Sequence, residues 1–79
     1  MGKKYSDQNV KSLYYAKDNQ QYIIADVPDI GLLKSLGIVK NATVRKKLTH
    51  KLGGPVLLMV ESSQIAIGKD IAEKILVRG

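Results

Sequence analysis

The residues able to carry acid–base or nucleophilic chemistry in this 79-residue chain are one histidine, His50, and seven carboxylates. No carboxylate stands at a catalytic-motif spacing from His50, and no serine occupies a nucleophile elbow. The Gly53-Gly54 pair lacks the following Lys-Ser/Thr of a phosphate-binding loop. The seven carboxylates are Asp7, Asp18, Asp26, Asp29, Glu61, Asp70 and Glu73. Most of them fall in expected turns or at solvent-facing positions. We therefore expect a protein that is not an enzyme.

A resident metal centre is also not expected. The absence of cysteine excludes thiolate ligands, and a single histidine excludes any site that needs two imidazoles from one chain. The sequence neighbours of His50 include lysines, whose charges repel a cation, so we expect His50 to be a solvated loop residue. No cofactor is expected. Weak, transient binding of ferrous iron would require hard oxygen ligands such as those of Asp26 and Asp29.

The densest positive charge is the run RKKLTHK, residues 45–51. Strand alternation places Arg45 and Lys47 on one face and Lys46 on the inward face, which indicates a bulge or a sheet edge. Three interpretations stay open: a solvated strand and loop, a contact for an acidic protein or membrane phosphates, and a nucleic-acid contact. No tyrosine interleaves with the run, so a base-stacking platform is missing.

Two large apolar residues, Leu57 and Met59, share one face of the expected strand Val56–Val60, whose other face is also apolar. A helix expected over Ile30–Leu36 would make them core residues if it covered them. Uncovered, they would form a patch suited to a partner or a self-contact. The candidate partner-binding residues are Arg45, Lys46, Lys47, His50, Lys51, Leu57 and Met59.

Length and charge limit the class of protein that holds these residues. The chain is short enough for one domain. Its 13 Lys and Arg against 7 Asp and Glu give a net charge of +6, which favours anionic partners. No stretch approaches the roughly 20 apolar residues of a transmembrane span, and the N-terminal residues lack the apolar region of a secretory signal. We expect a soluble, cytoplasmic protein.

Apolar periodicity and turn residues predict five short strands and two short helices. Residues 1–12 are polar and are expected to form a flexible tail, which leaves residues 13–79 for the folded domain. Asn19 and Asn41 are turn signals, because asparagine tolerates positive φ. The expected elements are strands at Tyr22–Val27, Thr43–Thr49, Val56–Val60, Gln64–Ile67 and Leu76–Val77, a helix at Ile30–Leu36, and a mini-helix between Gly68 and Leu76.

So few residues cannot build two packed sheets, but five short strands can curl into a small barrel that hides strand edges. The mini-helix then acts as a corner, which lets the last strand pair near the first. Ile71 and Ile75 would close one end of the barrel, and Val44 and Leu48 would point into it. The expected fold is mainly β, a small barrel of about five strands with one or two short helices.

Two stretches, GLLKSLGIVKNATV and GGPVLLMVESSQIAIGKDIAEKILV, resemble the FeoA-type domain of ferrous iron transport. The matching residues are Leu33, Leu36, Gly37, Ile38, Val44, Gly54, Pro55, Val56, Ile65, Ala66, Ile67, Ala72, Ile75 and Val77. Asn19 and Asn41 stand where the family usually has glycine. The resemblance covers about residues 12 to 78 and implies an SH3-like β-barrel.

The resemblance also implies a non-enzymatic accessory protein of bacterial ferrous iron uptake. Its expected partner is the cytoplasmic, GTPase-containing part of a ferrous iron transporter of the GTPase-permease type, through which it would reach the membrane. The alternative is a small barrel that binds nucleic acid through Arg45–Lys51. The chain has no room for a helix-turn-helix, and DNA binding is not expected. The residues do not indicate an oligomeric state.

Overall fold

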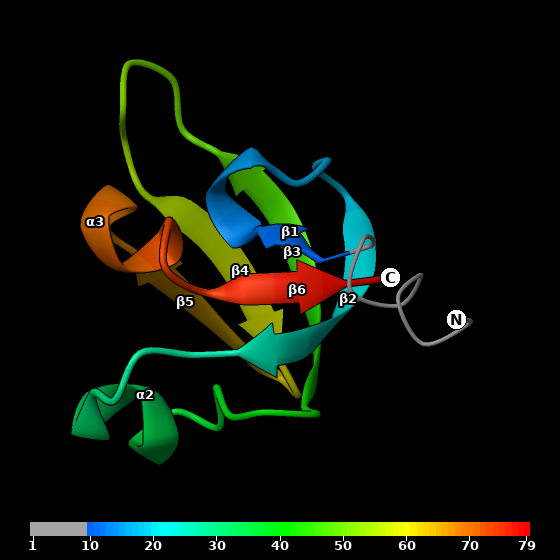
Figure 1. Cartoon of the computed structure of the whole chain (residues 1–79). Helices are drawn as coiled ribbons and strands as arrows, with labels where there is room; N and C mark the ends of the chain where they lie inside the picture. Colours follow the sequence, from blue (N-terminus) through cyan, green and yellow to red (C-terminus); the bar gives the residue numbers. More distant parts are fainter. Residues whose placement is uncertain (1–9) are drawn as a thin grey trace.

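The computed structural model describes residues 10–79, which form one six-stranded antiparallel sheet with short helices (Figure 1). The elements in chain order are β1 (Lys11–Ser12), the 3-10 turn η1 (Leu13–Tyr15), β2 (Gln20–Asp26), α2 (Gly31–Ser35), β3 (Thr43–Thr49), β4 (Val56–Val60), β5 (Ser63–Ile67), α3 (Lys69–Ala72) and β6 (Leu76–Arg78). The strand order in the sheet is β1-β6-β2-β3-β4-β5. The mainly β, SH3-like fold expected from the sequence is confirmed, with a two-residue strand added at the N-terminal side.

The sheet curls around a single core. Ile24, Val44, Leu58, Ile67 and Val77 come from five different strands, and all are buried in one apolar cluster. Strand pleating explains why these residues of each strand are buried, because alternate residues of a strand point to the same face. The curl brings β6 across the front of β4 (Figure 1), and the core fills the space that the curled sheet encloses.

The C-terminal corner works as the sequence predicted. After α3 turns the chain, β6 pairs with β2 on one side and with β1 on the other. Ile75 is fully buried, and Ile71 packs against the core cluster. The helix therefore needs no stability of its own, because it is held by the strands on either side of it. Strand β5 lies at an edge of the sheet. Within residues 10–79, the expectation that the curl hides strand edges therefore does not hold for β5.

Residues with positive φ place the turns and the end of α2. Asn19 and Asn41 have φ values of 63° and 74°, as their type predicts. Gly37, with φ of 83°, follows α2, and the N–H of Ile38 donates to the carbonyl of Leu33 to close the helix. Helix α2 lies beyond the end of β2, at one end of the curled sheet (Figure 1).

The N-terminal boundary differs from the expected one. Lys11 and Ser12 form β1 and pair with Val77 and Leu76, so they belong to the folded domain and not to a tail. The side-chain oxygen of Ser12 also accepts from the N–H of Tyr14 and so caps η1. The expected tail over residues 1–9 lies outside the described residues.

Candidate partner-binding surface

The basic run 45–51 is divided between the two faces of β3. Arg45 and Lys47 are exposed on the outer face, whereas the side chain of Lys46 is only 1% exposed and points into the barrel. Period-two alternation predicted this division. The sequence also predicted a bulge or an edge, and a bulge is present: the pairing between β3 and β4 shifts between Lys46 and Leu48.

The ammonium of Lys46 is held by three acceptors. Its Nζ donates to the carbonyl of Tyr14 at 3.1 Å and to the carbonyl of Ala16, and it lies 3.2 Å from Oδ1 of Asp18. An ammonium has three N–H donors, so this set satisfies it without water. Lys46 is therefore a structural residue, and the expectation that it forms part of a contact surface is wrong, because its charge is neutralised inside the domain.

The bulge also moves Leu48. Leu48 pairs with Leu57 and is half-buried, whereas the next residue, Thr49, pairs with the buried Val56. Residues paired across an antiparallel sheet point to the same face, so Leu48 lies with Leu57 on the outer face. The expectation that Leu48 points inward is wrong, because one extra residue in β3 reverses the alternation.

A mixed apolar and basic surface results, which we call the β3–β5 outer face. One cross-strand row consists of Arg45, Met59 and Gln64, and the next consists of Leu48, Leu57 and Ala66. Lys47 lies at the bulge between these rows. The β3–β5 outer face is defined by Arg45, Lys47, Leu48, Leu57, Met59, Gln64 and Ala66.

The apolar residues of this face are not core residues. Leu57 and Met59 are half-buried, and neither belongs to the core cluster or to the partly buried residues packed on it. Helix α2 does not cover them, because it lies at the end of the barrel. Of the two interpretations left open by the sequence, the structure supports the partly exposed patch.

His50 and Lys51 lie beyond this face, in the loop from β3 to β4. They line a shallow hollow with Asp18, Leu48 and Thr49. At Gly54 the chain passes close to His50, and a Cβ added to Gly54 would lie 2.7 Å from the Cβ of His50. At the loop tip, Leu52 is fully exposed with a φ of 61°, a feature that the sequence pattern did not single out.

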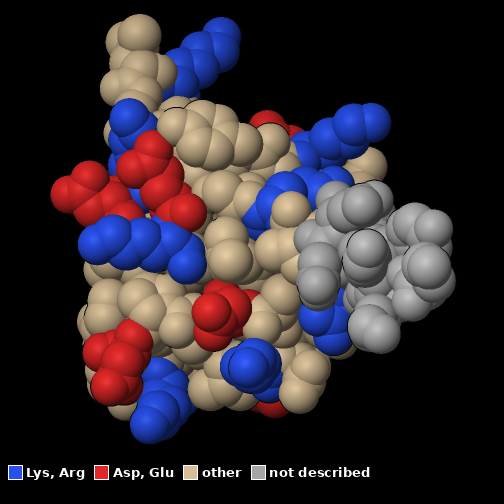
Figure 2. Space-filling view, viewed as in Figure 1, with Lys and Arg blue, Asp and Glu red and all other residues tan. Residues whose placement is uncertain are grey.

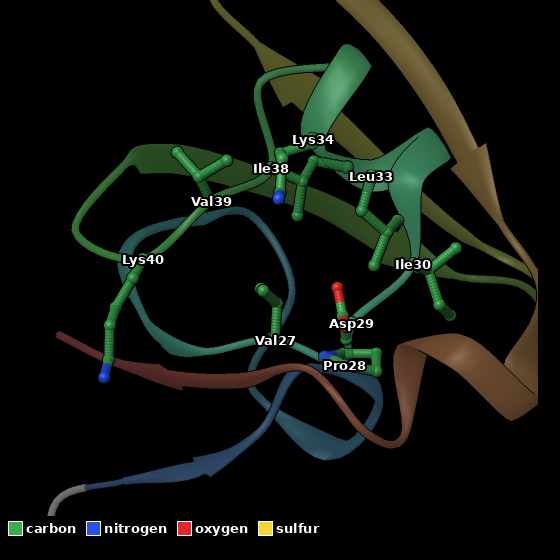
Figure 3. A pocket seen from close by; sticks show the side chains of 9 residues that line it. All are labelled: Val27, Pro28, Asp29, Ile30, Leu33, Lys34, Ile38, Val39 and Lys40. Atoms are coloured by element: carbon green, nitrogen blue, oxygen red, sulfur yellow. The ribbon is translucent and has the colours of Figure 1, made fainter.

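A second hollow, of about 230 Å³, lies between α2 and its flanking loops (Figure 3). Its walls are apolar, formed mainly by Val27, Ile30, Leu33 and Ile38, and charged groups are found only at Asp29, Lys34 and Lys40. The apolar walls of this hollow suit an apolar side chain.

The described residues do not bring metal ligands together. Within residues 10–79, no group of three or more His, Cys, Asp or Glu side chains is placed to hold a metal ion. Asp26 is exposed, and its Oδ1 accepts from the N–H of Val27. Among the same residues, no helix has the length and apolar character needed to cross a bilayer.

Charges on the side that carries β6 and α3 are of both signs and are interspersed (Figure 2). At the end of α3, Oε2 of Glu73 accepts a hydrogen bond from the hydroxyl of Tyr15 at 2.8 Å. That hydrogen bond is the main reason that the pKa of Tyr15 is raised above its usual value, with slight burial and the negative charge of Glu73 adding to it. Lys69 also lies 3.9 Å from Glu73.

The family model of the FeoA domain matches residues 11–79. A crystal structure of an iron uptake regulatory protein (FeoA) is similar to the chain, with a TM-score of 0.78 and 27% sequence identity over 87% of this chain and 94% of that chain. No curated protein sequence matches.

Metal-dependent repressors contain the same fold as one part of a longer chain. The repressor ScaR with bound Cd2+ has a TM-score of 0.78 and 26% identity, covering 86% of this chain and 34% of that one. A manganese-dependent transcriptional repressor in complex with manganese has a TM-score of 0.80 at 18% identity, covering 89% and 36%, a likeness of fold alone. This chain thus spans about a third of those repressors.

Proposed function

The chain belongs to the FeoA domain family, and from that premise we propose that it is a non-enzymatic accessory protein of ferrous iron uptake. The main support for this proposal is the match of the family model to residues 11–79, which include every described strand and helix. The similar FeoA structure is described as an iron uptake regulatory protein, and the two chains have nearly the same extent.

In this proposal the protein is cytoplasmic and docks on the cytoplasmic GTPase-containing part of a ferrous iron transporter of the GTPase-permease type. Iron is the cargo of that transporter, and the accessory protein holds no resident metal or cofactor. Two features favour a binding role. The walls of the hollow beside α2 are mainly apolar, and a basic and apolar surface is available on the strands.

Binding to the transporter tests this proposal directly. We expect the full chain to bind the purified cytosolic GTPase domain of the transporter in calorimetry at low salt. We also expect deletion of the gene to lower ferrous iron uptake, and the wild-type gene to restore it. Absence of binding at low salt, together with unchanged uptake, would contradict the proposal. Titration of the chain alone with ferrous or manganous ion should release no heat.

The nucleic-acid alternative gains no support from the geometry. Lys46, in the middle of the basic run, is buried, and only its neighbours Arg45 and Lys47 face outward from β3. The exposed Tyr15 lies on η1, with its hydroxyl bonded to Glu73. Mixing the chain with an oligonucleotide pool at low salt should therefore give no complex.

A further inference from the structure

The β3–β5 outer face combines exposed apolar area with charge of one sign. Leu48, Leu57 and Met59 are half-buried, and Ala66 is exposed beside them on the outermost strand. Apolar side chains that adjoin one another on a surface and pack on no core are typical of interaction sites. Methionine adds an adaptable side chain that can repack against different partners.

The charged groups of this face are all cations. Arg45 and Lys47 point outward from β3, and none of the outward-pointing residues of β3, β4 and β5 is Asp or Glu. An Nη2 hydrogen bond to the carbonyl of Asn19, at 3.3 Å, holds the Arg45 guanidinium at the β2 side of β3, which is one edge of this face. The side carrying β6 and α3 differs, because charges of both signs alternate there (Figure 2).

We propose that the β3–β5 outer face binds an acidic amphipathic segment of the partner protein. Neighbouring strands lie about 5 Å apart, so a helix of about 10 Å diameter spans β3 to β5. Its apolar stripe would cover Leu57 and Met59, and carboxylates along one edge of the stripe would reach Arg45 and Lys47. The identity of the protein that supplies this segment rests on the proposed docking function, whereas the chemistry of the segment does not.

Other occupants fit this face less well. A second copy of the chain would bring Arg45 and Lys47 against the same cations, and each copy carries a net charge of +6. A nucleic acid would call for stacking aromatics, whereas the large side chains here are leucine and methionine. A helix with an apolar stripe and carboxylates beside it matches both the apolar area and the positive charge of this surface.

The experiment uses the full chain labelled with 15N and a synthetic 18-residue amphipathic peptide of leucine and glutamate as the probe. Amide shifts should concentrate on β3, β4 and β5 during titration. The double variant R45E/K47E should weaken peptide binding by about tenfold, as expected when close charge pairs become repulsive. K34E/K40E changes the net charge equally but lies beside the α2 hollow, so it serves as the matched control and should bind like wild type.

Each other outcome overturns the inference. A peptide with glutamine in place of glutamate that binds equally well would remove the role of charge. Loss of binding in K34E/K40E instead would place the site at the α2 hollow. Shifts on β3–β5 that depend on protein concentration alone would indicate self-association, and binding to phosphatidylglycerol vesicles but not to the peptide would indicate a membrane. If the peptide binds as expected and the transporter domain does not bind, only the proposed function fails.

Discussion

Nζ of Lys46 lies 3.2 Å from Oδ1 of Asp18, joining a side chain that is 1% exposed to one that is 49% exposed. The same ammonium donates to two carbonyls in and beside η1. Lys46 thus fastens the middle of β3 to the segment that leads into β2. This fastening explains how a lysine can occupy a core position, because each of its donors has an acceptor.

Substitution of Lys46 by methionine tests this role. Lys46→Met keeps the apolar stem and removes the donors, which leaves the buried carbonyl of Ala16 without this partner. We expect a loss of about 1.5–3 kcal/mol in the free energy of unfolding, the range for hydrogen bonds to a charged group. Urea denaturation measures it. Lys47→Met removes an exposed cation from the next residue and should change stability by less than about 0.5 kcal/mol; equal stabilities of the two variants would contradict the fastening role.

The positions of Lys46 and Leu48 show how far the fold could be predicted from the sequence. Alternation along Thr43–Thr49 predicted an inward lysine and even the irregularity beside it, since both follow from the period of two. It could not predict that the bulge falls after Lys46, because the shift depends on pairing with β4. That shift moved Leu48 outward and added it to the apolar residues Leu57 and Met59 of the candidate surface.

Helix α2 shows a related limit. The sequence predicted a short helix over Ile30–Leu36, and the structure has one at Gly31–Ser35. Leu32, which lies within the expected helix Ile30–Leu36, is 64% exposed, while its neighbour Leu33 is buried. A helix of five residues makes little more than one turn, so tertiary placement decides which leucine faces the core.

Two glycines at opposite ends of α2 give a paired prediction on stability. Gly37 has a φ of 83°, and a Cβ there would lie 3.3 Å from Cγ1 of Val60, so Gly37→Ala should cost about 1–2 kcal/mol for the left-handed conformation alone. Gly31 lies at the start of the helix, where an added Cβ would meet no atom within 4 Å. Gly31→Ala should therefore stabilise the domain by about 0.4–1 kcal/mol. Thermal unfolding measures the stability of both variants. A Gly31→Ala protein that is less stable than the Gly37→Ala protein would contradict this prediction.

The bond between Tyr15 and Glu73 predicts a pH effect with a defined sign. Because the bond favours the protonated phenol, the folded-state pKa of Tyr15 lies above the unfolded value of about 10. Its contribution to stability is present below pH of about 10 and is lost as pH rises through the folded-state pKa. Glu73→Ala should lower the pKa of Tyr15 towards the unfolded value in an NMR titration of the ring carbon. Asp70→Ala removes a neighbouring acid that is not bonded to Tyr15, and an equal drop in that variant would disprove the assignment to Glu73.

Leu52, at the tip of the β3–β4 loop, gives a prediction that separates stability from binding. Its φ of 61° is costly for leucine, and its full exposure means that it gains no packing in return. Asparagine adopts this conformation readily, so Leu52→Asn should raise the free energy of unfolding by about 0.5–1 kcal/mol. Leu52→Ala keeps the conformational cost and should leave stability unchanged within about 0.5 kcal/mol. Because the loop lies beyond the β3–β5 outer face, both variants should bind the acidic peptide like wild type; weaker binding by the more stable Leu52→Asn protein would extend the contact surface to the loop.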